Sequence, residues 1–340
     1  MLTEPERREV AKPLVYMTRE LFPEVLDIIG KVADIRVWMG EEVIPRETLL
    51  EEVKDIDGLL SLPPDKVNSQ LMDAAPRLKV VSNYAVGYDN VDVAEATRRG
   101  ILVTNTPGVL SGTTADLAFA LLMAAAREIV MYDKYVRNGL WRIPGKPMQF
   151  LGQDIHHSTL GIVGMGRIGT EVARRAAGFQ MHVLYHNRKR REDVEKELGV
   201  EYIGTLPELL SRSDFICLLV PLTAETKKLI GPAEFAMMKP TAVLVNAARG
   251  QVVDQKALYE ALKSGQIAAA GIDVFEVEPL PADDPLLTLD NVVITPHIGS
   301  ASVGTRKKMA VMAAEGLVAA LKGKIPQNCV NPEAFKRGSK

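Results

Sequence analysis

The chain has 340 residues, 47% hydrophobic and 25% charged, with a formal net charge of −2 at pH 7. This length suits two domains better than one, and the composition supplies two hydrophobic cores. The charge balance gives no basic surface for nucleic acid, and no apolar run approaches the roughly 20 residues that cross a bilayer, so neither partner is expected.

Short apolar runs alternate with helical stretches from the start of the chain. The N-terminus, MLTEPERREVAKP, lacks the apolar core of a signal peptide. Strands are predicted at residues 14–17, 58–62, 79–82 and 101–104, and helices at 20–32 and 92–99. A turn-rich joint, TPGVLSG, then precedes a long predicted helix over residues 113–137. This alternation indicates a parallel sheet with helices on both faces.

The same alternation restarts near residue 158. Its strands are TLGIVG, MHVLYH, DFICLLV, AVLVNA, AAGIDV and VVITPH, and a last helix is predicted over residues 302–321. We predict an α/β protein of two doubly wound, Rossmann-like domains with parallel sheets. Residues 1–108 form the first part of an outer substrate domain, and residues 109–299 form a dinucleotide-binding domain. Residues 300–340 return to the outer domain, which is therefore discontinuous.

The two cysteines lie far apart in the sequence. Cys217 belongs to the apolar run FICLLV and is expected to be buried in a strand, whereas Cys329 lies near the C-terminus. Two distant cysteines form neither a disulfide framework nor a zinc site. We therefore expect no metal site and a reducing, cytoplasmic location.

A glycine loop follows the first strand of the second domain. Gly164, Gly166 and Gly169 form the pattern Gly-x-Gly-x-x-Gly between that strand and a helix. The first glycine permits a tight turn, the second lets backbone approach a pyrophosphate, and the third lets the helix pack on the strand. Together with Arg167 and Ile168 at the helix start, they are predicted to bind a dinucleotide. The alternative is a structural turn.

The next strand ends without the acid that usually binds the ribose hydroxyls of NAD. Asn187 and Arg188 stand at this place, and three further cations follow. An arginine binds a 2′-phosphate well, and a carboxylate would repel it. NADP(H) is therefore the predicted cofactor, with NAD(H) as the alternative and Arg188 as the main phosphate ligand. A solvated loop of cations is the competing interpretation.

Polar residues follow three later strands, at Arg249, Glu278 and His297. Ligands of open α/β sheets bind at the carboxyl ends of strands, so these residues are expected to converge. Reducing a ketone needs a proton for oxygen, and histidine is suited to supply it near neutral pH. A carboxylate beside it fixes one tautomer, and an arginine grips a substrate carboxylate.

The motifs GMGRIG, NAARG, DVFEVEP and TPHIGS resemble the D-isomer-specific 2-hydroxyacid dehydrogenase family. The segments NYAVGYDNVD and TADLAFALL extend the resemblance over nearly the whole chain, and the glyoxylate/hydroxypyruvate reductase branch is the most similar. The resemblance implies reduction of a small 2-oxo acid to the D-2-hydroxy acid. It makes His297 the proton donor, Glu278 its partner and Arg249 the substrate-binding arginine.

The resemblance also assigns supporting roles. Glu278, the glutamate before Pro279, matches the catalytic position, and Glu276 does not. Asp273 resembles the residue that meets the nicotinamide carboxamide. The backbone of Val86 and Gly87 resembles the loop that receives the substrate carboxylate.

Family membership further implies a homodimer. Residues 141–151 are shorter than their counterpart in archaeal glyoxylate reductases and form the arm that meets the partner in the family. Three alternatives stay open: a reductase for 2-ketogluconate, a dehydrogenase for 3-phosphoglycerate, and a non-catalytic NAD(H)-binding regulator like the family's corepressors. The second is disfavoured because no regulatory domain follows the last predicted helix.

Overall fold

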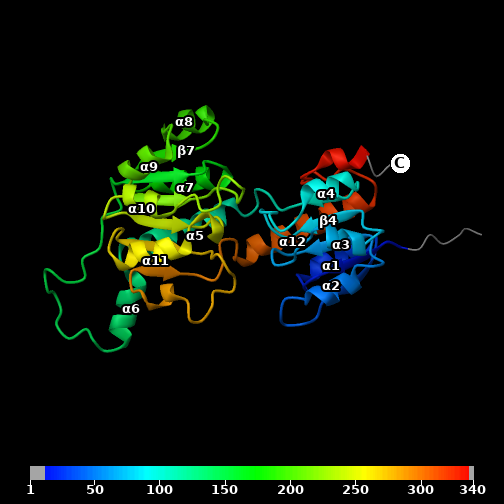
Figure 1. Cartoon of the computed structure of the whole chain (residues 1–340), viewed down its shortest axis with the longest axis horizontal. Coiled ribbons are helices and arrows are strands. Elements are labelled where there is room, and N and C mark those ends of the chain that lie inside the picture. Colours follow the sequence, from blue (N-terminus) through cyan, green and yellow to red (C-terminus); the bar gives the residue numbers. More distant parts are fainter. Residues whose placement is uncertain (1–11, 337–340) are drawn as a thin grey trace, which may run out of the picture. The chain divides into compact units, whose positions relative to one another are not determined.

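The computed structural model describes residues 12–336. The chain divides into two compact units, and Figure 1 shows their elements. Unit 1 comprises Met1–Leu110 and Ser302–Lys340, and unit 2 comprises Ser111–Ala301. Residues 1–11, where no signal peptide is expected, lie outside the described residues.

Unit 1 contains a five-stranded sheet with the order β2-β1-β3-β4-β5. Every pairing between these strands is parallel. Its strands are β1 (Leu14–Met17), β2 (Asp34–Val37), β3 (Gly58–Ser61), β4 (Val80–Asn83) and β5 (Leu102–Thr104). β3 and β4 are buried along their whole length, as expected of central strands covered on both faces.

Helices cover both faces of this sheet. They are α1 (Pro23–Gly30), α2 (Arg46–Glu52), α3 (Ser69–Ala74), α4 (Val93–Arg98) and α12 (Val303–Leu321). α12 packs on β3, β4 and β5 and against α1. Buried residues of α2, α3 and α4 pack with those of the strands in one apolar cluster. The short 3₁₀ helix Pro332–Lys336 follows α12, so both ends of the described chain belong to this unit.

The C-terminal segment is attached to unit 1 by the buried side chain of Asn331. Its Nδ2 donates to Thr97 Oγ1 at 2.9 Å and to the Ile101 carbonyl at 3.0 Å. Its Oδ1 accepts from the Val103 N–H at 2.8 Å. A buried amide with three partners gives this segment one register against β5, because any shift leaves buried polar groups unpaired.

Unit 2 contains a seven-stranded sheet with the order β12-β11-β10-β9-β6-β7-β8. All of its pairings are parallel. Its strands are β6 (Thr159–Val163), β7 (His182–His186), β8 (Glu201–Tyr202), β9 (Phe215–Leu218), β10 (Val243–Asn246), β11 (Ala269–Ile272) and β12 (Val292–Ile294). From β6 the next two strands are added on one side, and β9 and the later strands are added on the other side. A doubly wound sheet binds its ligand at this switch point, between β6 and β9.

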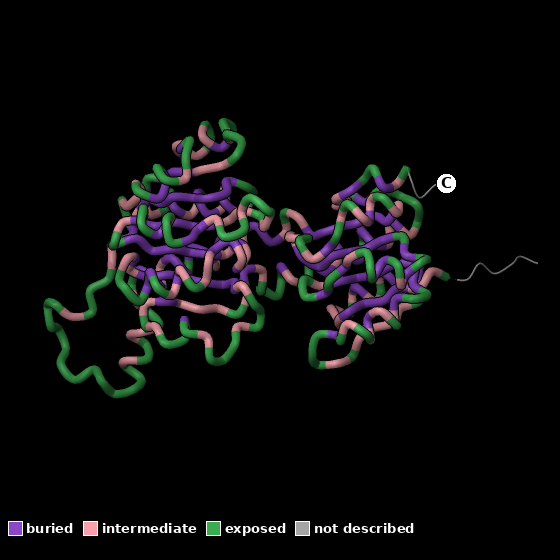
Figure 2. The backbone as a smooth tube through the Cα atoms, viewed as in Figure 1, coloured by how far each residue is buried: buried purple, intermediate pink, exposed green. Residues whose placement is uncertain are grey.

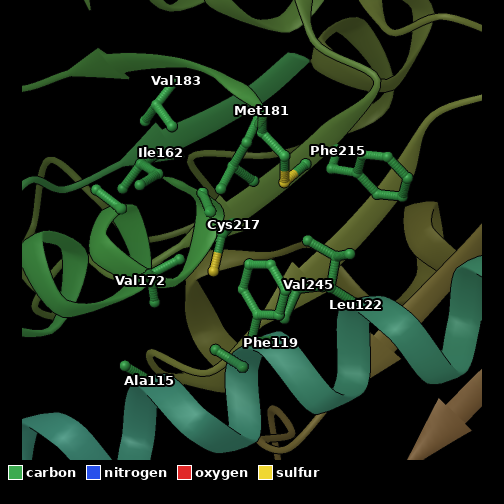
Figure 3. Packing of buried hydrophobic residues seen from close by; sticks show 14 of the residues in the cluster. Ala115, Phe119, Leu122, Ile162, Val172, Met181, Val183, Phe215, Cys217 and Val245 are labelled. Carbon is green, nitrogen blue, oxygen red and sulfur yellow. The ribbon is translucent and has the colours of Figure 1, made fainter. Parts of the chain in front are cut away.

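The helices of unit 2 are α5 (Ser111–Ala126), α6 (Ile129–Arg137), α7 (Arg167–Ala177), α8 (Glu192–Leu198), α9 (Leu206–Arg212), α10 (Pro232–Met237) and α11 (Gln255–Lys263), with 3₁₀ turns at Gly250–Val252 and Pro285–Thr288. They cover both faces of this sheet, except α6, which contacts α5 and has no buried residue. α5 packs on α7, β10 and β11. Figure 3 shows Phe119 and Leu122 of α5 packed toward Val245 and Cys217. Cys217 is 1% exposed, so its predicted burial in a strand is confirmed.

The single long helix predicted over residues 113–137 is wrong. The chain forms α5 and α6 instead, with Glu128 between them in the left-handed conformation at a φ of 52°. The Ala126 carbonyl accepts from the Gln153 N–H at 2.9 Å rather than continuing the helix. α6 has no buried residue. The sequence pattern of this segment therefore gave no sign that the helix breaks at Glu128.

Candidate active site

The glycine loop joins β6 to α7 in unit 2, and each glycine has a physical reason. Gly164 has a φ of 105°, a backbone conformation that residues other than glycine rarely adopt. A Cβ on Gly169 would lie 2.4 Å from the Gly164 carbonyl oxygen, so the helix start and the loop touch backbone to backbone. A Cβ on Gly166 would meet nothing within 4 Å, which leaves open space over the turn.

The first turn of α7 has free donors. Its N-cap, Gly166, provides no side-chain hydrogen bond. The N–H groups of Arg167, Ile168 and Gly169 donate to no acceptor within residues 12–336. The first bond of the helix is from the Thr170 N–H to the Gly166 carbonyl at 2.9 Å. Three unpaired amides at the positive end of an 11-residue helix fit the pyrophosphate of a dinucleotide.

The cations after β7 divide into two kinds. Arg190 pairs with Glu195, with its Nη2 2.7 Å from Oε2. Arg191 pairs with Asp193, with its Nη2 2.7 Å from Oδ2. These two arginines are therefore committed to acids of α8.

Arg188 and Lys189 differ from these two arginines. Both are exposed, and neither forms an ion pair with any residue that the structure describes. Asn187, before them, donates from Nδ2 to the Lys189 carbonyl at 3.2 Å and so shapes the turn. Among the predicted phosphate ligands, Arg188 keeps its guanidinium available for an external anion.

Arg249 follows β10 and is held in place through its backbone. Asn246 Nδ2 donates to the Arg249 carbonyl at 3.0 Å, and Asn246 Oδ1 accepts from the Ala248 N–H at 3.1 Å. Gly250 then passes so close to the loop after β11 that a Cβ would lie 1.8 Å from the Phe275 carbonyl carbon. This close approach keeps the loops after β10 and β11 together.

Glu278 and His297 are in direct contact. His297 Nδ1 lies 2.7 Å from Glu278 Oε2, and Glu278 Oε1 accepts from the Phe275 N–H at 3.0 Å. Burial would raise the pKa of Glu278, but the bonds from His297 and Phe275 and the charge of Arg249 together lower it. The carboxylate is therefore ionised at neutral pH and faces His297 Nδ1 as a hydrogen-bond acceptor. His297 Nε2 has no hydrogen-bond partner among the described residues.

Glu276 has a different task. Its Oε1 accepts from the Gln255 N–H at 3.2 Å, and its own N–H donates to Gln255 Oε1 at 3.0 Å. Glu276 therefore ties the loop after β11 to the start of α11. The carboxylate paired with His297 is that of Glu278.

Asp273 is 1% exposed and holds the turn that carries His297. Its Oδ1 accepts from Thr295 Oγ1 at 2.6 Å and from the Ile298 N–H at 2.8 Å, and its Oδ2 accepts from the Gly299 N–H at 2.8 Å. Its carbonyl accepts from the N–H of His297, whose φ is 52°. Burial raises the pKa of Asp273, although these bonds and the charge of His297 oppose the effect.

The structure thus brings Glu278 and His297 into contact and places Arg249 close enough to act on Glu278 by its charge. Val86 and Gly87 lie in unit 1, in the loop after β4. The sequence pattern did not single out Asn246 or Thr295 as residues that shape the site. A polar side chain at the end of an otherwise apolar strand was the available signal in both cases.

Residues 12–336 contain neither a metal-binding cluster nor a membrane-spanning helix. No group of three or more histidine, cysteine, aspartate or glutamate side chains is arranged to hold a metal ion there. Over the same residues, every helix is too short or too polar to pass through a bilayer.

The contact at Gly250 gives a prediction for stability. Gly250→Ala forces the loops after β10 and β11 apart, and we expect it to lower the free energy of unfolding by about 3 kcal/mol or more. Chemical denaturation measures this change. Gly30→Ala is the control, because a Cβ there meets nothing within 4 Å. Equal stability of the two variants would contradict the close approach.

Comparison with known proteins gives a family for this arrangement. The family model described as "D-isomer specific 2-hydroxyacid dehydrogenase, NAD binding domain" matches residues 119–299. The chain is 57% identical over 325 residues to a glyoxylate reductase of Korarchaeum cryptofilum, covering 96% of this chain and 98% of the relative. It is 52% identical to a glyoxylate reductase of Pyrococcus furiosus, covering 96% and 97%.

Solved structures agree with this result. The TT0316 protein of Thermus thermophilus superposes with a TM-score of 0.87 at 44% identity, covering 93% of this chain and 99% of that one. An NADPH-dependent glyoxylate/hydroxypyruvate reductase of Sinorhizobium meliloti, in complex with NADP and malonate, gives a TM-score of 0.81 at 34% identity, covering 96% and 98%. The predicted α/β fold of two Rossmann-like units with parallel sheets is confirmed. The chain belongs to the D-isomer-specific 2-hydroxyacid dehydrogenases, a family of oxidoreductases that use a nicotinamide cofactor, and within it to the glyoxylate reductase branch.

Proposed function

We propose that this protein reduces a small 2-oxo acid, glyoxylate or hydroxypyruvate, to the D-2-hydroxy acid with NADPH as the preferred cofactor. The observation that carries the proposal is the 2.7 Å contact between His297 and an ionised Glu278, within the unit that has the glycine loop. The names of the relatives support the same substrates.

The proposed reaction adds a hydride to C2 and a proton to its oxygen, so the ketone becomes a secondary alcohol. When bound, the reduced nicotinamide supplies the hydride. His297 donates the proton from Nε2 as negative charge develops on the oxygen. Glu278 stabilises the protonated ring before the transfer, and Arg249 binds the carboxylate and polarises the carbonyl. The backbone amides of Val86 and Gly87 are further proposed donors to a substrate carboxylate.

A panel of 2-oxo acids, each assayed with NADPH and with NADH, tests the proposed substrate and cofactor. We expect the highest kcat/KM for glyoxylate and hydroxypyruvate with NADPH. A higher value for phenylpyruvate or another bulky acid would overturn the substrate assignment. The absence of turnover with every acid would favour a binding protein over an enzyme.

The support that Glu278 gives His297 predicts a change in the pH profile. Because the pKa of Glu278 is lowered, its charge is present throughout the neutral range and is lost only as the pH falls below the usual range of a glutamate. Glu278→Gln removes this charge, so the protonated ring that gives up the proton loses its stabilising partner. We expect the alkaline limb of the reduction profile to move to lower pH in this variant.

Glu276→Gln is the matched control for that measurement. Its carboxylate binds the backbone of Gln255 and makes no contact with the ring, so the limb should stay in place. A profile that moves in Glu276→Gln and not in Glu278→Gln would show that the wrong carboxylate has been assigned.

The preference for NADPH is assigned to Arg188. Its guanidinium is exposed and without an ion pair in the described chain, and a 2′-phosphate offers it a charge-assisted bond. We expect Arg188→Ala to raise KM for NADPH by about 10- to 100-fold and to leave KM for NADH nearly unchanged.

Arg190→Ala is the control for this variant. It removes the same charge from the same loop, but that guanidinium is paired with Glu195. We expect little change in its KM for NADPH. An equal rise with both cofactors in Arg188→Ala would contradict the assignment.

We also propose that the protein is a homodimer formed through residues 129–151. Half of the exposed large hydrophobic residues of the described chain lie there: Ile129, Val130, Val136, Leu140, Trp141, Ile143, Met148, Phe150 and Leu151. Figure 2 shows this stretch as an almost continuously exposed segment of unit 2. A second copy of the chain is the proposed cover for this apolar surface.

Light scattering of a charged variant tests this interface. We expect Trp141→Glu combined with Ile143→Glu to reduce the mass from a dimer to a monomer. Met39→Glu, at a residue of unit 1 that is 71% exposed, should leave the mass unchanged. A monomeric wild-type protein would contradict the proposal.

A further inference from the structure

The loop after β4 has its carbonyl groups fixed from within unit 1. The Ala85 carbonyl accepts from the Thr106 N–H at 2.8 Å. The Val86 carbonyl accepts from Asn105 Nδ2 at 2.8 Å, and the Gly87 carbonyl accepts from Asn83 Nδ2 at 2.9 Å. Three successive peptide groups are therefore each held by a separate donor.

The opposite sides of these peptide groups are free. In a trans peptide, the N–H points away from the carbonyl of the same planar group. Holding the carbonyls of residues 85–87 therefore turns the N–H groups of Val86, Gly87 and Tyr88 away from the donors. Over residues 12–336, none of these three N–H groups finds an acceptor. Successive free amides in a turn can bind an anion.

The two asparagines are themselves well fixed. Asn83 is fully buried at the end of β4, and its Oδ1 accepts from Ser61 Oγ at 3.1 Å. Asn105 is 8% exposed, and its backbone bonds Asn328 in both directions. Asn105 donates its N–H to the Asn328 carbonyl and accepts from Asn328 Nδ2 at 2.6 Å. The amide of Asn83 cannot turn without breaking its bond with Ser61, and the backbone of Asn105 cannot shift without breaking its bonds with Asn328, which is costly in a buried region.

We propose that Asn83 and Asn105 are positioning residues, which orient three backbone amides toward the carboxylate of the substrate. The third donor is the N–H of Tyr88, which extends the pair at Val86 and Gly87. This inference rests on the proposed function for the identity of the anion. The asparagines do not touch the substrate; they act through the peptide groups that they hold.

Replacing each asparagine singly by leucine tests the proposal. Asn105→Leu and Asn83→Leu keep nearly the same size and remove the donor, so a carbonyl of the loop is released. We expect KM for glyoxylate to rise by about 10- to 100-fold, since each misplaced amide weakens a bond to a charged group. KM for NADPH and kcat at saturating glyoxylate should change much less. If one variant fails to fold, the other carries the test.

Thr97→Val is the matched control. It removes a hydroxyl that Asn331 binds in unit 1, and it leaves the loop untouched. A merely structural role of the asparagines predicts that all three variants lose thermal stability without a selective rise in KM for glyoxylate. That outcome would overturn the proposal.

A binding measurement separates this proposal from the proposed reaction. In the presence of NADPH, oxamate should shift the backbone amide resonances of Val86, Gly87 and Tyr88 in the wild type and in Thr97→Val, and much less in Asn105→Leu. If these shifts are seen but no 2-oxo acid is turned over, the proposed reduction is rejected and the positioning role of the asparagines is supported. Turnover with unshifted amides, or with equal shifts in Asn105→Leu, would reject the positioning role alone.

Discussion

The geometry of the proposed catalytic residues depends on one buried carboxylate, that of Asp273. Its two oxygens accept three hydrogen bonds from residues 295–299, and its carbonyl holds the N–H of His297. Its own N–H donates to the Asn246 carbonyl at 3.1 Å, which links it to the strand before Arg249. The segments after β10, β11 and β12 thus meet at a single residue. His297 can keep its left-handed backbone conformation because this carboxylate bonds the turn on both sides of it.

In unit 2, some charged side chains are paired within the fold, and others remain unpaired among the described residues. Arg190 and Arg191 stabilise the start of α8 through acids, and Glu276 ties a loop to α11. Arg188 and the first turn of α7 keep their donors free. A charge that is already paired within the fold loses little by staying paired, whereas an unpaired cation or amide gains when an anion arrives. This difference, and not the number of cations, supports Arg188 as the residue that selects the cofactor.

Much of this architecture could be predicted from the sequence, for identifiable reasons. Buried parallel strands are short apolar runs, so β1, β3 and β6 were located to within a residue or two. Glu278 and His297, which were predicted to converge at the carboxyl ends of such strands, are in contact. The strand Asp34–Val37 was missed because none of its residues is fully buried and its pattern is mixed. The break at Glu128 depends on a bond from a distant residue, Gln153, which local patterns do not encode. Asn83 and Asn105 were missed for a related reason, since their partners are backbone carbonyls that no motif reveals.

In the proposed reaction His297 donates the proton, and Glu278 stabilises the protonated ring before the transfer. The most direct test is His297→Gln, with the rate of glyoxylate reduction and the Kd for NADPH measured on the same preparation. We expect turnover to fall by about 10²–10⁴-fold, the usual scale for a lost general acid, while the Kd for NADPH stays nearly unchanged because the glycine loop is intact. Turnover close to that of the wild type, at normal NADPH binding, would contradict this role of His297.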